Sequence, residues 1–247
     1  MASVIKDWGV AALYGCGSNN CKLPLGIKSI GAIWFLLALL WALLLVKYLS
    51  RFRYAAIYLI VIALLSYISA QYIWLPFSIQ AGGVASCFVY VGYLAKRLSL
   101  LEKTFNKIIL LIGAIVWCIE FMQQQIALSM VSCYYSKGVV SMIGALLICY
   151  LVLFISKRLS NTKLGNVFSF YGRYSLVILC FHLIELYMAP WGKVSELIVS
   201  LGLNSYIAVC IIFLLKVLFG TSCVLISLKI SCIGKLFGIS AKKEKIA

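Results

Sequence analysis

Seven long apolar stretches decide what this chain can fold into. A helix needs about 20 mostly apolar residues to cross the hydrocarbon core of a membrane. Seven segments approach or reach that length: 30–48, 54–73, 79–95, 108–122, 138–156, 174–190 and 206–228. They predict an all-α fold, a polytopic membrane helix bundle with about seven transmembrane helices.

The composition excludes the main water-soluble classes of protein. Apolar and aromatic residues make up 64% of the 247 residues, and only 11% are charged. Soluble globular domains carry about 25% charged residues. A soluble enzyme, a disordered protein and a small disulfide scaffold are therefore all excluded, and the bilayer is the first expected partner.

The basic residues predict the orientation of the bundle. Of the 22 Lys and Arg residues, sixteen follow the first, third, fifth or seventh apolar segment, five lie on the opposite side, and Lys216 lies within the seventh segment. Basic residues collect on the cytoplasmic side of membrane proteins. We therefore expect an external N-terminus and a cytoplasmic C-terminus. The net charge of +16 then reflects membrane topology and not binding to nucleic acid.

Three regions follow from this pattern. Residues 1–29 are expected to form an external, loop-like segment, 30–228 the transmembrane bundle, and 229–247 a basic cytoplasmic tail. The ten cysteines contain no CxxC pair, which makes a structural metal site improbable. Cys16 and Cys21 are the only plausible disulfide pair, and their pairing would need an oxidising compartment.

Small and aromatic residues predict further details of the bundle. A run of small residues on the third segment predicts close helix packing: Gly82, Gly83, Ala85 and Ser86. Four tryptophans near external helix ends are expected to anchor the membrane interface: Trp34, Trp74, Trp117 and Trp191.

Three ionisable side chains lie deep in the last two apolar segments. An ionised group at the bilayer centre costs about 2.5–3.5 kcal/mol, so each one needs an explanation. His182 and Glu185 are three residues apart and share a helix face, and Lys216 lies at a comparable depth on the next helix. The three can meet if the helices pack. They then form either a structural polar lock between the helices or a site that handles protons or contacts substrate.

Three stretches in this order and spacing resemble the acyltransferase family 3 membrane proteins. They are 31–39, which contains Trp34; 75–97, which begins Leu-Pro-Phe-Ser-Ile and ends Lys-Arg; and 171–182, which begins Tyr-Gly-Arg-Tyr-Ser-Leu and ends Phe-His. The most similar branch is the bacterial one resembling fucose 4-O-acetylase. The resemblance implies an enzyme of the bacterial cytoplasmic (inner) membrane. Such an enzyme transfers an acyl (acetyl) group from acyl-CoA to a hydroxyl of a cell-surface glycan or lipid-linked sugar, without a metal.

The resemblance covers only the later helices of that family. The early-helix histidine thought to act in acyl transfer has no counterpart here, because the sole histidine, His182, matches the late stretch. We therefore expect an N-terminally truncated relative that lacks the first three helices.

The candidate residues and the alternatives follow from both arguments. His182, Glu185 and Lys216 are candidates for catalysis, and none of them is secure. Trp34 and Arg173 are candidates for substrate binding, although interface anchoring is the simpler role for Trp34. A transporter or flippase-like component and a non-catalytic membrane component are the alternative functions.

Overall fold

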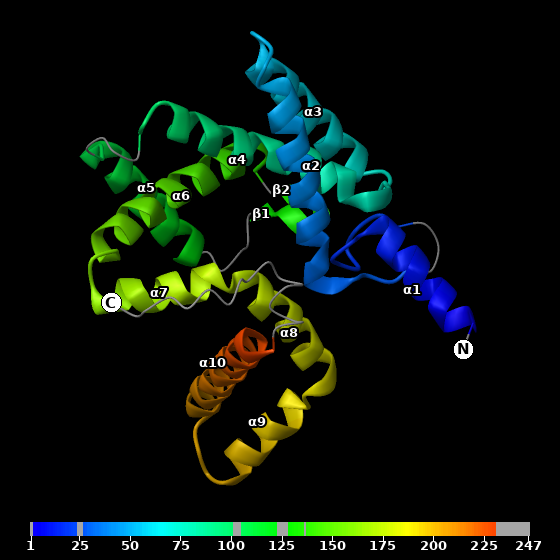
Figure 1. Ribbon diagram of the computed structural model, residues 1–247, viewed down its shortest axis with the longest axis vertical. Helices are drawn as coiled ribbons and strands as arrows, with labels where there is room; N and C mark the ends of the chain where they lie inside the picture. Colours follow the sequence, from blue (N-terminus) through cyan, green and yellow to red (C-terminus); the bar gives the residue numbers. More distant parts are fainter. Residues whose placement is uncertain (1, 24–26, 101–104, 123–127, 136, 231–247) are drawn as a thin grey trace. The chain divides into compact units, whose positions relative to one another are not determined.

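The computed structural model describes residues 2–23, 27–100, 105–122, 128–135 and 137–230. Within this part, contacts divide the chain into two compact units, Met1–Leu159 and Ser160–Ala247. Helices account for nearly all of the regular structure (Figure 1). The predicted all-α class is therefore confirmed.

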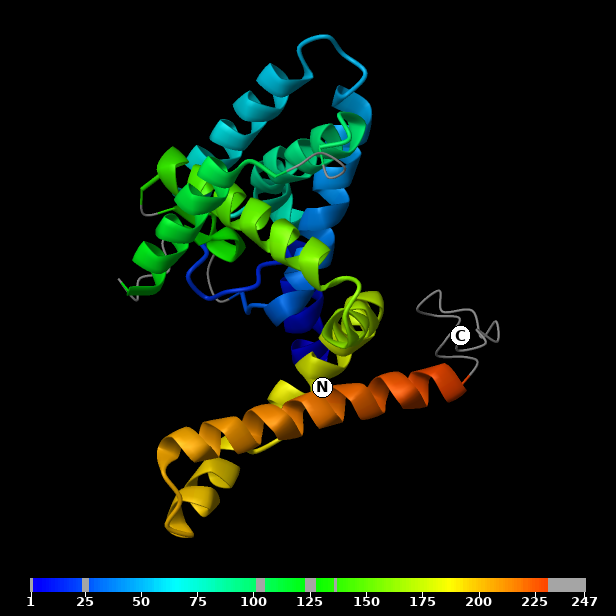
Figure 2. The ribbon, with the colours of Figure 1, turned by 90° about the vertical axis from the view of Figure 1, so that its left-hand side faces the viewer.

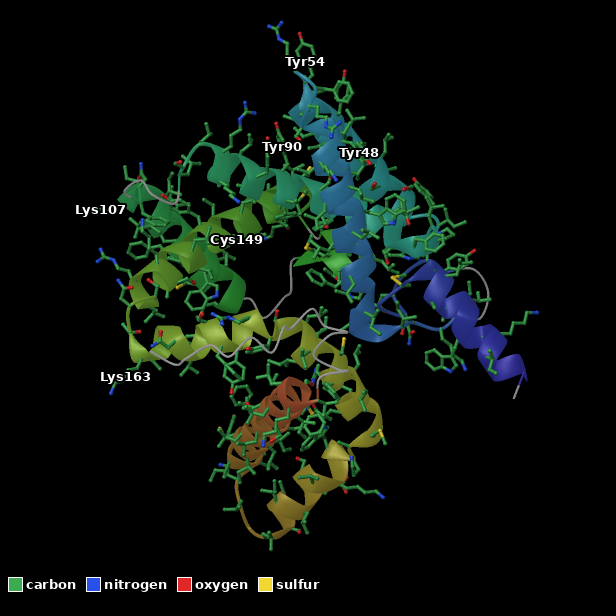
Figure 3. The ribbon with its side chains drawn as sticks, viewed as in Figure 1. Tyr48, Tyr54, Tyr90, Lys107, Cys149 and Lys163 are labelled. Carbon is green, nitrogen blue, oxygen red and sulfur yellow. A yellow bond between two sulfur atoms is a disulfide. The ribbon has the colours of Figure 1, made fainter. Side chains whose placement is uncertain are left out.

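Three helices form the centre of the first unit. The helix α2 (Trp34–Leu49) follows the 3-10 turn η1 (Gly31–Ile33), and α3 (Ala55–Ala70) returns beside it. The two helices form a hairpin whose tip carries Tyr54 (Figures 1 and 3). The turn η2 (Pro76–Ser78) then leads into α4 (Ile79–Arg97), which packs against both α2 and α3.

Glycines on α4 allow this close approach. A Cβ atom on Gly82 would lie 2.5 Å from Trp41 Cβ and 3.0 Å from the carbonyl oxygen of Ala38, both on α2. A Cβ atom on Gly83 would lie 2.9 Å from Ser66 Cβ on α3. Neither position has room for a side chain, and Ser86 is fully buried on the same helix. The predicted close packing of this segment is confirmed.

A compact group of buried residues closes one end of the three helices. Its members include Trp74, Tyr135, Cys133 and the disulfide between Cys16 and Cys21 (Figure 3, yellow bond). We call these five residues the disulfide cap. The pairing of the two cysteines, left open by the sequence, is present here. The expectation that Trp74 anchors the membrane interface is wrong, because its side chain is fully buried in this cap.

The cap brings together three segments that are distant in the sequence. The strands β1 (Leu128–Ser129) and β2 (Tyr134–Tyr135) pair antiparallel around the turn η3 (Met130–Ser132). The Gln71 side chain at the end of α3 donates a hydrogen bond of 3.0 Å to the carbonyl of Cys133. The Gln80 side chain is buried and accepts a 2.8 Å bond from the Leu75 amide. Burial of the Gln80 side chain is offset by its hydrogen bonds to the Leu75 amide and the Ile73 carbonyl.

Residues before the first apolar segment are also helical. The helix α1 (Ala2–Tyr14) contains mostly Ala, Val, Ile and Leu, and Gly15 follows it at a φ of +62°. A glycine in this left-handed conformation is a common helix stop. The expectation of a loop over 1–29 is therefore wrong for 2–14, because the glycines and asparagines that suggested a loop are concentrated in 15–20.

Two antiparallel helices complete the first unit. The helix α5 (Lys107–Met122) packs against α6 (Val139–Leu159). Asn106 caps α5, since its side-chain oxygen accepts hydrogen bonds from the amides of Ile108 at 2.9 Å and Ile109 at 3.3 Å. The Tyr150 hydroxyl of α6 accepts a bond from the Asn106 amide at 2.9 Å.

The described part of the second unit, residues 160–230, contains four helices. They are α7 (Lys163–Arg173), α8 (Ser175–Met188), α9 (Trp191–Ser200) and α10 (Ser205–Lys229). The long helix α10 packs against both α8 and α9 (Figure 2). Side chains of Thr162 and Asn204 accept hydrogen bonds from the first turns of α7 and α10. The sequence reasoning missed α7 and α9, which are too short or too polar to count as membrane spans.

Each predicted apolar segment lies on a helix, but the helices differ in length. Four are long and apolar enough to cross a membrane: Gly31–Leu49, Pro76–Arg97, Val139–Leu159 and Ser205–Lys229. A fifth crossing results if α7 and α8, which meet at 68°, count as one broken span. The helices α3 and α5 have 16 residues each, about 24 Å at 1.5 Å per residue. The seven-span count therefore remains a prediction. Of the predicted basic tail, 229–247, residues 231–247 lie outside the part of the chain that the structure describes.

The outer faces of the long helices are apolar. Large side chains such as Leu43 on α2, Leu153 on α6 and Leu218 on α10 are exposed. Exposed apolar faces of this kind are unfavourable in water and mark contact with lipid or with another protein. The structure therefore fits a membrane-embedded protein.

Candidate functional site

The three ionisable residues of the last two apolar segments meet in the second unit. On α8, His182 and Glu185 are one helical turn apart, and His182 Nδ1 lies 2.9 Å from Glu185 Oε2. On α10, Lys216 Nζ lies 3.4 Å from the other carboxylate oxygen, Glu185 Oε1. The predicted meeting of these residues is confirmed. We call them the α8–α10 cluster.

Glu185 is the centre of the α8–α10 cluster. Its side chain is only 3% exposed, and Val177 and Leu183 are buried on the same helix. Oε2 pairs with the His182 imidazole. Oε1 forms an ion pair with the Lys216 ammonium group, but the geometry of this contact is not that of a hydrogen bond. An isolated buried carboxylate would be very costly, and the two neighbouring nitrogens offset that cost.

The His182 imidazole lies at the edge of the cluster. Its side chain is 41% exposed, in contrast to that of Glu185. Of the two neutral tautomers of this imidazole, a carboxylate next to Nδ1 favours the one that carries its proton on Nδ1. The lone pair on Nε2 is then free to accept a proton from another molecule. This arrangement of carboxylate and imidazole is the one used to orient a general base.

A tryptophan from a third helix completes the cluster. Lys216 Nζ lies 5.2 Å from the centre of the Trp191 ring at the start of α9. An ammonium group over an indole face is attracted to its negative π-surface. The sequence placed Trp191 at a helix end as an interface anchor and missed this contact. The position of Trp191 just after Pro190, where the chain turns back toward α10, was the one sequence signal that could have indicated this contact.

The two candidate substrate-binding residues belong to other elements, Trp34 to the start of α2 and Arg173 to the end of α7. Trp34 is in the first unit, half-buried against the disulfide cap, and a Cβ atom on Gly17 would lie 2.5 Å from its Cγ atom. Trp34 is thus a packing residue of that unit. Arg173 is exposed at the C-terminal end of α7. Its neighbour Tyr171 forms a hydrogen bond of 2.8 Å between its hydroxyl and the Thr221 hydroxyl on α10.

The disulfide cap contains a second group of buried titratable residues. Burial raises the pKa of the Cys133 thiol to about 12. Burial, together with the neighbouring Cys133 and Cys87, also raises the pKa of Tyr135. Thiols with a raised pKa are inert, because the thiolate is the reactive form. Cys133 is therefore a structural residue and not a nucleophile.

Comparison with known proteins gives no external guide to this site. No family model matches the chain, no curated protein is similar to it, and no solved structure is similar to it. Among the residues that the structure describes, no three His, Cys, Asp or Glu side chains are grouped as a metal site requires. The chemistry of the α8–α10 cluster must therefore be argued from its own geometry.

Proposed function

We propose that this chain is a membrane acyltransferase-like protein that transfers an acyl group from acyl-CoA to a hydroxyl of a cell-surface glycan or lipid-linked sugar. The observation that carries the proposal is the pair formed by His182 Nδ1 and the buried Glu185 carboxylate, 2.9 Å apart. The pair leaves Nε2 of a half-exposed imidazole free to act as a base. The resemblance of three sequence stretches to acyltransferase family 3 supplies the substrate classes.

In this proposal, His182 activates the acceptor hydroxyl. Nε2 takes the hydroxyl proton while the hydroxyl oxygen attacks the thioester carbonyl of acyl-CoA. The new C–O bond forms, the C–S bond breaks, and the CoA thiolate leaves. The proton held on Nε2 passes to the thiolate, which returns the imidazole to its neutral form. Glu185 stabilises the positively charged imidazole during the step.

Lys216 keeps the carboxylate available for this role. Its ammonium group lies 3.4 Å from Glu185 Oε1 and is itself held over Trp191. Without Lys216, the buried carboxylate would gain by taking up a proton. A protonated Glu185 could not stabilise an imidazolium ion. Lys216 is therefore a positioning residue in this mechanism.

The proposal places the protein in a bacterial inner membrane, with seven crossings and the N-terminus outside. Two features of the first unit support the orientation. The tip of the α2–α3 hairpin carries Arg51 and Arg53, both exposed, as a cytoplasmic loop would. The opposite end of these helices holds the Cys16–Cys21 disulfide, which is favoured in an oxidising compartment.

A radiolabel transfer assay tests this function. The full chain in lipid vesicles is given acetyl-CoA labelled in the acetyl group, together with lipid-linked sugars extracted from bacterial membranes. We expect the label to appear in the glycolipid. Mild alkali should release this label, because it cleaves O-esters. The E196Q variant is the control, because Glu196 is an exposed carboxylate on α9. The absence of label above protein-free vesicles would contradict the proposal.

A second candidate function rests on the same cluster. A carboxylate, an imidazole and an ammonium group that link two membrane helices also resemble a proton relay of a transporter. In vesicles with a pH gradient, a transporter would dissipate the gradient in the presence of solute, and K216Q would abolish this. An acyltransferase would leave the gradient unchanged in both forms.

A further inference from the structure

The short helix α7 has two chemically different faces. Leu164, Val167, Phe168 and Tyr171 recur at the spacing i, i+3, i+4 and i+7, which places them on one face of the helix. Asn166, Ser169 and Arg173 occupy the opposite face. Leu164, Val167 and Phe168 are each more than half exposed. The apolar face is thus uncovered along most of its length.

Chain connectivity keeps α7 close to a membrane surface. Only residues 160–162 separate it from the end of α6, a helix long and apolar enough to cross a membrane. A connection of this length spans at most about 14 Å. At its other end, Tyr174 alone separates α7 from α8, and the helix axes meet at 68°. If α8 runs along the membrane normal, α7 therefore lies closer to the membrane plane.

Tyr171 shows which way the apolar face points. Its hydroxyl bonds to Thr221, which lies eight residues before the end of α10 at Lys229. At 1.5 Å per residue, Thr221 is about 12 Å inside that end. The apolar face is therefore turned toward the interior of the membrane. Leu164, Val167 and Phe168 share this face and would enter the lipid.

The charge of the segment favours one kind of lipid surface. Residues 157–173 contain four basic residues and no acidic residue: Lys157, Arg158, Lys163 and Arg173. Lys163 projects away from the start of α7 (Figure 3). Its aliphatic stem can lie along the apolar surface while its ammonium group reaches the headgroup phosphates. Anionic headgroups attract such clusters of basic residues.

We propose that α7 lies in the interface of an anionic lipid leaflet, with Leu164, Val167 and Phe168 in the acyl-chain boundary and Lys163 at the headgroups. The proposal needs only that the chain is embedded in a membrane, and it is independent of acyl transfer. Helices with one apolar and one polar face, flanked by basic residues, bind membranes in this way. The partner is therefore a lipid surface rich in anionic headgroups.

Single cysteines introduced on the two faces test the position of α7. F168C and L164C report the apolar face, and the adjacent S169C and N166C are their matched controls on the polar face. The full chain is reconstituted in open bilayer fragments, and labelling by a water-soluble maleimide is compared with that of the parent protein, whose native thiols give the background. We expect labelling of F168C and L164C to be at least tenfold slower than that of S169C and N166C.

The alternatives give different labelling patterns. Equal rates on both faces would show that α7 lies in water, and protection of all four positions would show a broken span; either result would overturn the proposal. A fluorophore on F168C, but not on S169C, should be quenched by brominated lipids. If F168C is protected without quenching, protein and not lipid covers the face, and the proposal fails.

The lipid composition tests the choice of an anionic surface. We expect protection of F168C to rise when phosphatidylglycerol is added to phosphatidylcholine bilayers. In the K163Q background, the gain in protection of F168C should be about fivefold smaller. Each basic residue near an anionic surface contributes about a fivefold factor in affinity. Protection that is the same in both lipids would contradict the anionic preference.

Discussion

Replacing Lys216 by methionine should destabilise the second unit, because it removes the only ammonium group next to Glu185 that the structure describes. Two unit charges 3.4 Å apart attract by about 5 kcal/mol at an effective dielectric constant of about 20. Removing one partner of a buried pair costs about 3–5 kcal/mol, because the other charge is left uncompensated. His182 remains 2.9 Å away and offsets part of this loss. We therefore expect K216M to cost about 3 kcal/mol.

Unfolding of the full chain in mixed detergent micelles measures this loss. K193M is the matched control, since Lys193 on α9 is exposed and its loss should change the free energy of unfolding by less than about 0.5 kcal/mol. The double variant E185Q/K216M removes both charges and should recover to within about 1 kcal/mol of the parent protein. The reasoning is refuted if K216M is as stable as K193M. It is also refuted if the free energy of unfolding lost by E185Q/K216M equals the sum of the losses of E185Q and K216M measured separately.

Further predictions concern the first unit. The G82A variant should lower the free energy of unfolding by about 1–3 kcal/mol, because its Cβ atom would overlap α2. The control is G92A on the same helix, whose Cβ atom meets nothing within 4 Å and which should be neutral or slightly stabilising. Thermal unfolding of both variants checks this. Removing the disulfide with C16S/C21S should cost about 2 kcal/mol, as expected for so short a loop, and the same assay measures it; no change would show that the bond does not form. Cys133 should resist maleimide in the folded protein at pH 8, as mass spectrometry of its peptide can show, because its pKa is about 12. The favourable contribution of the protonated thiol to stability is full below the ordinary thiol pKa of 9.0 and is lost as the pH rises toward about 12.

The positions of the apolar helices could be predicted from the sequence because long apolar runs have one stable form in lipid. A helix satisfies all of its own backbone hydrogen bonds, so segments such as 206–228 leave little choice. Close packing at Gly82 was also visible, since small residues on a membrane helix mark a close neighbour. The same rule could not say which helices reach the full membrane thickness, because α3 and α5 stop at 16 residues.

The helices α1, α7 and α9 were missed for a different reason. They are short and only partly apolar, so no single window of the sequence exceeds the threshold for a membrane span. Local and tertiary contacts stabilise them, and α1 packs against η2 while α9 packs against α10. Thr162 caps α7, for example, and Tyr171 ties it to α10. The hydrogen bond between Tyr171 and Thr221 joins residues 50 positions apart, which sequence periodicity does not record.

The candidate site was predicted in part. Helical spacing placed His182 beside Glu185, and comparable depth placed Lys216 within reach, as the structure confirms. Trp191 was not predicted as a member, because nothing in the sequence gives the angle at which α9 folds back toward α10. The role of the cluster also could not be decided, since a structural lock and a general base use the same residue types.

Acyl transfer by the H182N variant tests the central claim most directly. Asparagine keeps an N–H donor near the position of Nδ1, opposite Glu185, but provides no base in place of Nε2. Transfer of labelled acetyl from acetyl-CoA to the glycolipid and the thermal midpoint are measured on the same vesicles. We predict a loss of transfer of at least about a hundredfold, with a midpoint close to that of the parent protein. Transfer that persists above about a tenth of the parent rate would contradict His182 as the base.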